Sequence, residues 1–346
     1  MYQHGGDIYS NKNVIDYSAN INFLGMPESV KKAAKDAVDL SEHYPDVQCR
    51  NLKRAISERD KVSPDIIFCG NGAADVIFSL VLAKKPKNAL LPVPSFYEYQ
   101  QALQSVQCKI STYGLDEKNG FRVTEDILSH ITPQTDMLFL CNPNNPTGEV
   151  VERELLEKVL RKCEQTGTLL VVDECFNDFL EEPEKYTMMP FVEKSENLFI
   201  LKAFTKMYAM AGLRLGYGIC SDGALIDRME RISQPWRVSI PAQAAGIAAV
   251  KETEFVEKSR REIGIQKKKM LDAMCDMGYQ VYGSKANYIF FEGEYHLGEQ
   301  MKERGFLIRD CSNYQGLHLG FYRIVVRGEE DNKAFLQALK EIHLGI

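Results

Sequence analysis

Two ionisable side chains stand where apolar stretches give way to loops, the position at which open α/β sheets bind their ligands. Lys206 follows one such stretch, with Arg214 eight positions later, and a desolvated lysine amine there could form a Schiff base with a carbonyl group. Asp173 ends the stretch LLVVDE, and a carboxylate there could keep a pyridine nitrogen protonated. Each signal alone is weak, because most lysines after strands are solvated and many strand-terminal aspartates cap helices.

Two loops carry further polar groups. FCGNGAADVIF (residues 68–78) combines a strand end, a glycine-bounded turn and the start of an apolar-periodic helix, whose free N–H groups could bind an anion. LCNPNNPTGEVV (residues 140–151) places two prolines and three asparagines after an apolar strand. Asn145 in this rigid loop could hydrogen-bond a ring hydroxyl, although Asn-Pro turns and Gly-x-Gly turns also occur without any function.

These motifs lie between about residue 66 and residue 220, where short apolar runs alternate with amphipathic stretches. This alternation predicts an α/β fold, and runs that are apolar throughout predict a mostly parallel sheet buried on both faces. Residues 152–167 predict an amphipathic helix that ends at a glycine. The predicted strands are residues 88–93, 137–141, 169–174, 198–203 and 215–220.

The pattern of residue types changes after about residue 236, and this change predicts a second, smaller α+β domain. A long charged helix near residues 251–276 is followed by several strand-like runs and a final helix. We therefore expect a large, mostly parallel α/β domain (31–235), a small C-terminal α+β domain (236–346), and an N-terminal arm or lid (1–30) that joins the small domain.

The composition of the 346 residues excludes several classes of function. A formal net charge of −6 disfavours non-specific nucleic-acid binding, which needs a basic surface. Nine cysteines are scattered singly and six histidines show no ligand spacing, so neither a disulfide framework nor a metal site is predicted. The N-terminus lacks the pattern of a signal peptide, and no apolar run is long enough for a membrane span, so we expect a cytoplasmic location and no membrane partner.

The motifs together resemble a known family. GNG, NPNNPTG, the strand-terminal DE and the TK before AGLRLGYG have the order and spacing of the fold type I pyridoxal-phosphate enzymes of the class I and II aminotransferase superfamily. The resemblance spans nearly the whole chain. It implies that the cofactor is pyridoxal 5′-phosphate, that Lys206 binds it covalently, and that Asp173 contacts its pyridine nitrogen.

The resemblance also assigns the phosphate of that cofactor to a cup of local donors. Gly72 and Ala73 would supply N–H groups, Thr205 a hydroxyl and Arg214 a cation.

Three further residues acquire roles in the same way. Phe96 in PSFYEY would stack on the cofactor ring, and Asn145 would face its hydroxyl. Tyr44 in HYPD is similar to the tyrosine that reaches the phosphate of the neighbouring subunit, which implies a homodimer with shared active sites.

The chain departs from the family pattern at two positions, and the first departure, Phe176, is tolerated in one branch of the family. Phe176 stands where aminotransferases often have a tyrosine that donates to the ring oxygen, and Ala203 replaces a hydroxyl residue often used on the cofactor phosphate. Losing these groups should alter the pKa at the cofactor and weaken its binding modestly. The stretches HGGDI, YSANINFLGMP, QPWRVS, IRDCSNYQGL and YRIVVR are similar to the threonine-phosphate decarboxylases of cobamide synthesis, relatives of the histidinol-phosphate aminotransferases.

For the substrate, this branch implies two arginines. Arg327 would bind the carboxylate and Arg309 a phosphate, since a planar guanidinium suits both anions. His4 and Asn20 could line the phosphate pocket or a lid, although the histidine beside two glycines could equally be a plain loop residue.

The resemblance leaves the outcome of the reaction open between two enzymes. The leading hypothesis is decarboxylation of O-phospho-L-threonine, or O-phosphoserine, to an amino-alcohol phosphate for cobamide assembly. The alternative is an aminotransferase of the histidinol-phosphate type, because the same residues serve both reactions. A non-catalytic relative is a third possibility, disfavoured by the presence of Lys206, Asp173, Asn145 and Arg214 together.

Overall fold

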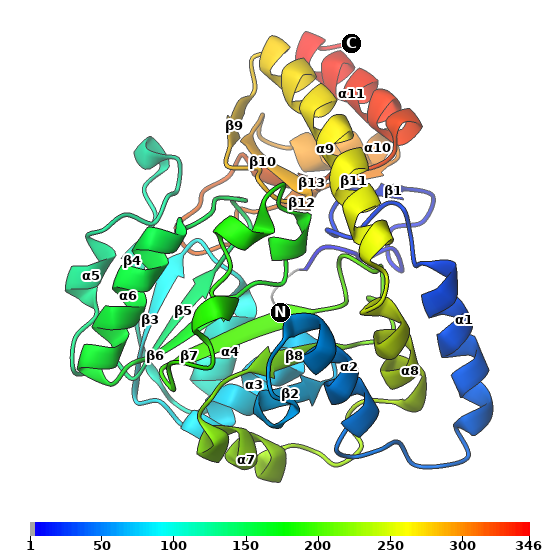
Figure 1. Cartoon of the computed structure of the whole chain (residues 1–346). Coiled ribbons are helices and arrows are strands. Elements are labelled where there is room, and N and C mark those ends of the chain that lie inside the picture. Colours follow the sequence, from blue (N-terminus) through cyan, green and yellow to red (C-terminus); the bar gives the residue numbers. More distant parts are fainter. Residues whose placement is uncertain (1–3) are drawn as a thin grey trace.

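A seven-stranded sheet occupies the larger part of the molecule in the computed structural model, which describes residues 4–346 (Figure 1). Neighbouring strands are parallel except at β8, which is antiparallel to both of its neighbours. The mostly parallel α/β sheet predicted from the apolar runs is therefore confirmed. In spatial order the strands are β2 (Ile67–Gly70), β8 (Gly216–Ile219), β7 (Leu198–Ala203), β6 (Leu169–Asp173), β5 (Met137–Cys141), β3 (Asn88–Val93) and β4 (Lys109–Gly114).

The central strands of this sheet are buried on both faces. Along β5, Leu138 and Leu140 belong to one apolar cluster while Met137 and Phe139 belong to another, as the alternation of side chains along a strand requires. The second cluster is completed by α3 (Ala73–Lys84), α4 (Tyr97–Ser105) and α7 (Gly223–Ile232). Around this sheet, the helices that contribute to the first cluster are α1 (Glu28–Asp36), α2 (Arg50–Asp60), α5 (Ile127–His130), α6 (Arg153–Thr166) and α8 (Ile240–Ala249).

A smaller antiparallel sheet lies above the first in Figure 1, flanked by α9, α10 and α11. Its strand order is β12 (Arg309–Asp310), β13 (Phe321–Val325), β10 (Tyr288–Glu292) and β9 (Gln280–Tyr282). The helices are α9 (Thr253–Asp276), α10 (Leu297–Glu303) and α11 (Glu329–Leu344). Short 3₁₀ turns occur at η1 (Ala37–Leu40), η2 (Pro64–Ile66), η3 (Glu117–Asn119), η4 (Asn177–Phe179), η5 (Pro183–Lys185) and η6 (Met189–Phe191).

The N-terminal segment lies beside these C-terminal elements. β1 (Ile15–Asp16) pairs in parallel with β11 (Phe306–Leu307), and the Tyr17 carbonyl accepts a hydrogen bond from the Val325 N–H at 2.8 Å. The division of the chain into residues 1–30, 31–235 and 236–346 stays a prediction. Within the part of the chain that is described, no helix combines the length and the apolar character needed to cross a bilayer.

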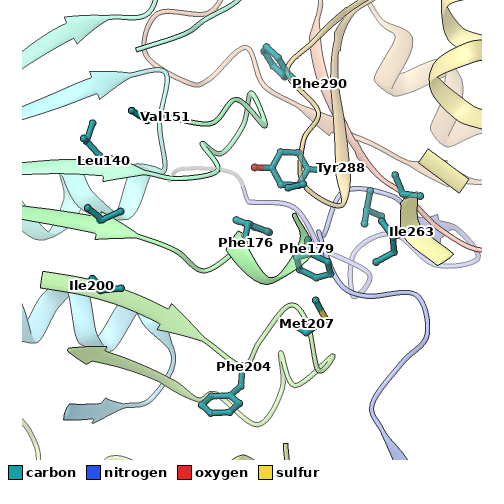
Figure 2. Close-up of a cluster of buried hydrophobic side chains, with 14 of the residues drawn as sticks. Leu140, Val151, Phe176, Phe179, Ile200, Phe204, Met207, Ile263, Tyr288 and Phe290 are labelled. Carbon is teal, nitrogen blue, oxygen red and sulfur yellow. The ribbon is translucent and has the colours of Figure 1, made fainter. Parts of the chain in front are cut away.

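An apolar core continues between the two sheets. Figure 2 shows Phe176 and Phe179, just after β6, on the side that faces Tyr288 of β10. The rings of Phe176 and Tyr288 meet edge to face with centroids 5.1 Å apart, and Ile263 of α9 belongs to the same cluster. This packing brings the small sheet over the carboxyl ends of the parallel strands, where the predicted reactive residues lie.

Candidate active site

A cavity lies at the carboxyl ends of β6 and β7, between the two sheets and the N-terminal segment. It gathers side chains that are distant in sequence, because the strand ends, the start of α3 and the small sheet all meet there. The lining side chains that carry nitrogen or oxygen atoms are those of His4, Ser18, Asn20, Glu98, Asn145, Asp173, Thr205, Lys206, Arg214, Arg309, Tyr314 and Arg323.

Lys206 lies in the loop after β7, and that loop is held by the N-terminal segment. The backbone N–H of Asn22 donates to the Lys206 carbonyl at 3.1 Å, and the Asn22 side-chain amide donates to the Met207 carbonyl at 2.9 Å. Burial of the amine, followed by the charges of Arg323 and Arg214, lowers the pKa of Lys206 to about 8. A fraction of the amine is therefore neutral, and nucleophilic, near physiological pH.

Asp173, the last residue of β6, is buried in the same cavity and is held rigidly. Its Oδ1 accepts from the backbone N–H of Cys175 at 2.9 Å, and its Oδ2 accepts from the Tyr99 hydroxyl at 2.5 Å. Burial raises the pKa of this carboxyl, while both hydrogen bonds and the charge of Lys206 act in the opposite direction. A carboxylate placed in this way favours a cationic partner.

The N-terminus of α3 and Arg214 form a second corner of the cavity. Gly72 has φ +85°, and a Cβ at this position would lie 2.5 Å from Nη2 of Arg214. Only glycine therefore lets the guanidinium lie against the turn. Ala73, Thr205 and Arg214 line the cavity, whereas Gly72 supports Arg214 from behind. A helix N-terminus beside a guanidinium and a hydroxyl is suited to a phosphate group.

Arg323 links the loop after β5 to the small sheet. Its Nη1 donates to Oδ1 of Asn145, and its Nη2 donates to the Ser18 carbonyl at 2.7 Å. Its side chain is buried within β13, yet it lines the cavity.

A third group of polar residues lies around Arg309. The Arg309 Nη2 donates to Oδ1 of Asn313 at 2.8 Å, and its guanidinium lies 5.2 Å from the Tyr314 ring centroid. Nearby, the buried Oδ1 of Asn20 has no hydrogen-bond partner among residues 4–346, and His4 lies at the cavity edge. Arg309, Asn20 and His4, predicted together from sequence, thus share one cavity.

Arg327 is not part of this cavity, so its predicted contact with a substrate carboxylate requires correction. Its Nε donates to Oδ2 of Asp331 at 2.9 Å, and its Nη1 donates to the Asp16 carbonyl at 3.3 Å. The reason is the position of the strand: β13 ends at Val325, whereas Arg323 lies inside it, opposite Arg309 of β12. Arg323 is the arginine that faces the carboxyl ends of the large sheet.

Four other residues singled out from the sequence have clear positions. Phe96 and Phe176 line the cavity, together with Ala203. Tyr44 is 77% exposed and stacks on Trp236, with ring centroids 4.4 Å apart, so it does not belong to the cavity of its own chain. Its role in a neighbouring subunit stays a prediction.

Sequence reasoning missed Glu98 and Tyr99, besides Arg323. Arg323 carried a readable signal, since a charged residue inside the apolar strand FYRIV must have buried partners. Glu98 and Tyr99 lie in the first turn of α4, where an acidic residue next to aromatic residues resembles an ordinary helix start. Among the described residues, no cluster of His, Cys, Asp or Glu could hold a metal ion.

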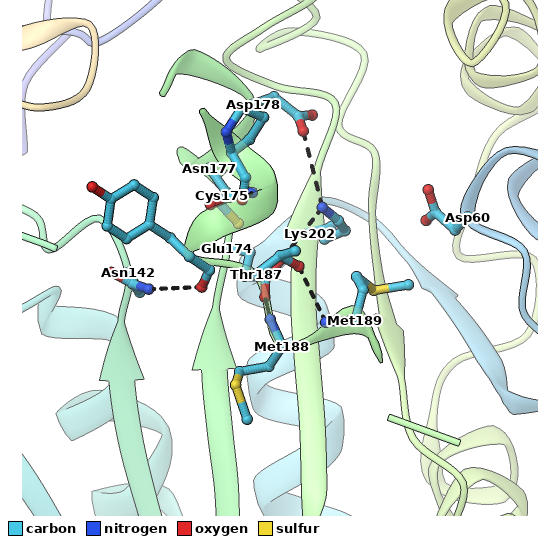
Figure 3. A network of polar contacts seen from close by, with 12 residues as sticks. Asp60, Asn142, Glu174, Cys175, Asn177, Asp178, Thr187, Met188, Met189 and Lys202 are labelled. Atoms are coloured by element: carbon cyan, nitrogen blue, oxygen red, sulfur yellow. Dashed lines mark hydrogen bonds and ion pairs between the residues drawn. The ribbon is translucent and has the colours of Figure 1, made fainter. Parts of the chain in front are cut away.

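A buried polar network links the carboxyl ends of β6 and β7 (Figure 3). Lys202 of β7 lies 3.4 Å from Oε2 of Glu174, which also accepts from the Thr187 hydroxyl at 2.8 Å. Oε1 of Glu174 accepts from the backbone N–H of Met188 at 2.7 Å. Glu174 directly follows Asp173, and Lys202 lies in β7 four positions before Lys206, so this network links the two strand ends that carry Asp173 and Lys206.

Comparison with known proteins agrees with this arrangement. The model of the family "Aminotransferase class I and II" matches residues 12–339. The chain is 36% identical to the threonine-phosphate decarboxylase of Salmonella typhimurium, over 99% of this chain and 97% of that protein. It is 30% identical to the histidinol-phosphate aminotransferase of Methanosphaera stadtmanae, over 96% and 91%. The crystal structure of the histidinol-phosphate aminotransferase from Clostridium acetobutylicum superposes with a TM-score of 0.89 at 28% identity, covering 95% of this chain and 99% of that one.

Proposed function

We propose that this chain, which belongs to the class I and II aminotransferase family, is a decarboxylase of O-phospho-L-threonine or O-phospho-L-serine. The product would be an amino-alcohol phosphate for cobamide assembly. The observation that carries the proposal is the presence of two buried arginines, Arg309 and Arg323, in the cavity that holds Lys206 and Asp173. Two cations suit a substrate with two anionic groups, and the Salmonella relative is named for this reaction.

The cofactor of this family is pyridoxal 5′-phosphate, and the cavity residues fit it. Ala73, Thr205 and Arg214 would hold the phosphate at the helix N-terminus, where the glycine turn leaves room for the guanidinium. Asp173 would hold the ring nitrogen protonated, and Lys206 would bind the aldehyde carbon.

Phe96 and Asn145 complete the proposed cofactor site. Phe96 lines the cavity beside Tyr99, with ring centroids 5.6 Å apart, and offers an apolar face for the cofactor ring. Asn145 is oriented by Arg323 through its Oδ1, which leaves its side-chain N–H groups to donate to the ring hydroxyl.

The substrate would lie between the two arginines. Arg323 would bind the α-carboxylate, and Arg309, together with His4 and Asn20, would bind the phosphate. Asn20 would contribute through its side-chain N–H groups, because a phosphate dianion accepts hydrogen bonds and has none to donate.

When bound, the cofactor supplies an electron sink for the bond that breaks at the α-carbon. Arg323 and Arg309 fix the two ends of the substrate and so decide which bond lies in the reactive orientation. After carbon dioxide leaves, Lys206 Nζ would donate the proton that the α-carbon takes up, and its pKa of about 8 suits a group that accepts and returns protons. The small sheet and the N-terminal segment would cover the substrate during this step.

An aminotransferase of the histidinol-phosphate type is the alternative, since the Methanosphaera relative is named for that activity and needs the same kinds of group. Phe176 favours the decarboxylase, because no tyrosine hydroxyl is available at that point of the cavity.

A homodimer and a cytoplasmic location complete the proposal. The exposed Tyr44–Trp236 stack supports a dimer, because it leaves a large aromatic surface outside its own cavity. Nine cysteines without a disulfide among the described residues support a reducing compartment.

A substrate comparison tests the function. The purified enzyme, loaded with pyridoxal 5′-phosphate, should release carbon dioxide from O-phospho-L-threonine and far less from L-threonine. Transfer of the amino group from histidinol phosphate to 2-oxoglutarate, without carbon dioxide from phosphothreonine, would refute the decarboxylase and support the alternative.

A further inference from the structure

Glu98 is a cavity residue to which the proposed reaction gives no role. It lies in the first turn of α4, directly before Tyr99, and its side chain is 14% exposed. Its Oε1 lies 3.5 Å from Nδ1 of His4. Its Oε2 is buried and has no hydrogen-bond partner among residues 4–346. The carboxyl group is therefore poorly solvated and meets His4 through a single oxygen.

Burial and the neighbouring charges together set the pKa of Glu98. Lys206 and Arg309 favour the carboxylate, and the negative charge of Asp173 opposes it. Burial is the largest influence and raises the pKa of Glu98 to about 7. Tyr314 also faces this group, and burial together with Arg309 lowers the pKa of His4. Before a phosphate binds, a proton near neutral pH is thus more favourable on Glu98 than on His4.

A phosphate monoester changes this balance, since it carries close to two negative charges at neutral pH. Arg309 supplies one positive charge at the proposed phosphate end. Of the other basic residues that line the described cavity, Lys206 and Arg214 belong to the cofactor and Arg323 to the carboxylate. His4 is the side chain left to supply the second charge, and it does so only as an imidazolium.

We propose that Glu98 is a positioning residue that acts through His4 to make the cavity specific for a doubly charged phosphate group. As the dianion enters, the O–H bond of the Glu98 carboxyl breaks and an N–H bond forms at His4 Nδ1. The carboxylate then faces the imidazolium, and His4 Nε2–H donates to the phosphate. No proton is exchanged with solvent in this step. The inference rests on the phosphate site of the proposed function.

Calorimetric binding of ethyl phosphate to the cofactor-loaded enzyme tests this transfer, because ethyl phosphate has neither an amine nor a carboxylate with which to react. Between pH 6 and pH 8, the affinity of the wild type for the dianion should stay constant up to pH about 7 and fall above it. In Glu98→Gln the fall should begin at lower pH, so that affinity at pH 7 is at least about tenfold weaker. An unchanged pH profile in Glu98→Gln would overturn the proposal.

A double variant tests whether Glu98 acts through His4. His4→Gln and His4→Gln/Glu98→Gln should bind ethyl phosphate with equal affinity, because Glu98 has no proton acceptor left. A further loss in the double variant would mean that Glu98 contacts the ligand or only supports the fold, and would refute the proposal. Glu125→Gln is the matched control, since Glu125 pairs with Lys158 at the surface and should leave the profile unchanged.

The two proposals fail separately. Ethyl phosphate binding with the expected pH profile, but no carbon dioxide from O-phospho-L-threonine, would refute the proposed reaction and leave the Glu98–His4 pair standing. Carbon dioxide release from O-phospho-L-threonine, with no effect of Glu98→Gln on the affinity for ethyl phosphate, would support the proposed reaction and refute the role of the Glu98–His4 pair.

Discussion

Arg323 of the small sheet donates a hydrogen bond to Asn145 of the loop after β5, a residue 178 positions earlier in the chain. This contact joins the proposed substrate arginine directly to the residue proposed to face the cofactor hydroxyl. The Tyr288 hydroxyl of β10 also donates to the Asn144 carbonyl of this loop at 2.6 Å, so the position proposed for the substrate carboxylate depends on the position of the loop.

The first prediction concerns which arginine binds the carboxylate. Arg323→Gln should lower kcat/KM for O-phospho-L-threonine, because a buried charge-assisted contact is lost. The decrease should correspond to roughly 2 to 4 kcal/mol of transition-state stabilisation. Arg327→Gln should cost less than about 1 kcal/mol, since that arginine forms a partly exposed pair with Asp331. Steady-state kinetics of the two variants, side by side, decide the matter. A larger loss in Arg327→Gln than in Arg323→Gln would instead assign the binding of the substrate carboxylate to Arg327.

Cofactor capture should depend on pH through Lys206. Its pKa of about 8 means that the neutral fraction of the amine rises about tenfold with each unit of increasing pH up to about 8 and levels off above it. The rate at which the cofactor-free enzyme binds pyridoxal 5′-phosphate, followed by absorbance, should have the same profile. Lys206→Ala should abolish the covalent capture. A rate that keeps rising beyond pH 10 would indicate an amine with an ordinary pKa.

Gly72→Ala should weaken the binding of cofactor. The added Cβ would lie 2.5 Å from Nη2 of Arg214, and the residue has φ +85°, so the turn and the guanidinium must both shift. We expect a loss of about 1–3 kcal/mol in affinity for pyridoxal 5′-phosphate, measured by equilibrium dialysis. Gly212→Ala is the control, because a Cβ there meets no atom within 4 Å. Equal affinities for both variants would contradict the proposed phosphate corner.

The network in Figure 3 should contribute to stability through charge pairing. Lys202→Met leaves the buried carboxylate of Glu174 without its cation, which should cost about 3–5 kcal/mol of unfolding free energy. The double variant Lys202→Met/Glu174→Gln should recover most of that loss, because glutamine keeps an acceptor for the Met188 N–H. Urea unfolding measures both. No recovery in the double variant would mean that the lysine acts through packing rather than charge.

Much of the architecture could be predicted from the sequence, because the central strands are apolar throughout and their ends carry the motifs. Residues 88–93, 137–141 and 198–203 were predicted with the observed bounds. The edge strand Lys109–Gly114 was not predicted, because it is largely exposed and its polar residues give no apolar run.

The site was predictable where a motif places a residue and not where tertiary packing does. Lys206 and Asp173 follow directly from strand ends. Choosing between Arg323 and Arg327 requires knowing where β13 ends. The two arginines are only a few residues apart, which is as small as the uncertainty of a strand end inferred from sequence. The position of Glu98 in the cavity could not be predicted, because it depends on how α4, the N-terminal segment and the small sheet pack together.

The fate of the α-hydrogen tests the central claim most directly. O-phospho-L-threonine carrying deuterium at the α-carbon should be converted to carbon dioxide and an amino-alcohol phosphate that retains the deuterium, with one new hydrogen taken from solvent. Mass spectrometry of the product, together with trapped carbon dioxide, measures this. Loss of the deuterium to solvent, with the carboxyl group retained in a keto acid, would contradict the account and identify an aminotransferase.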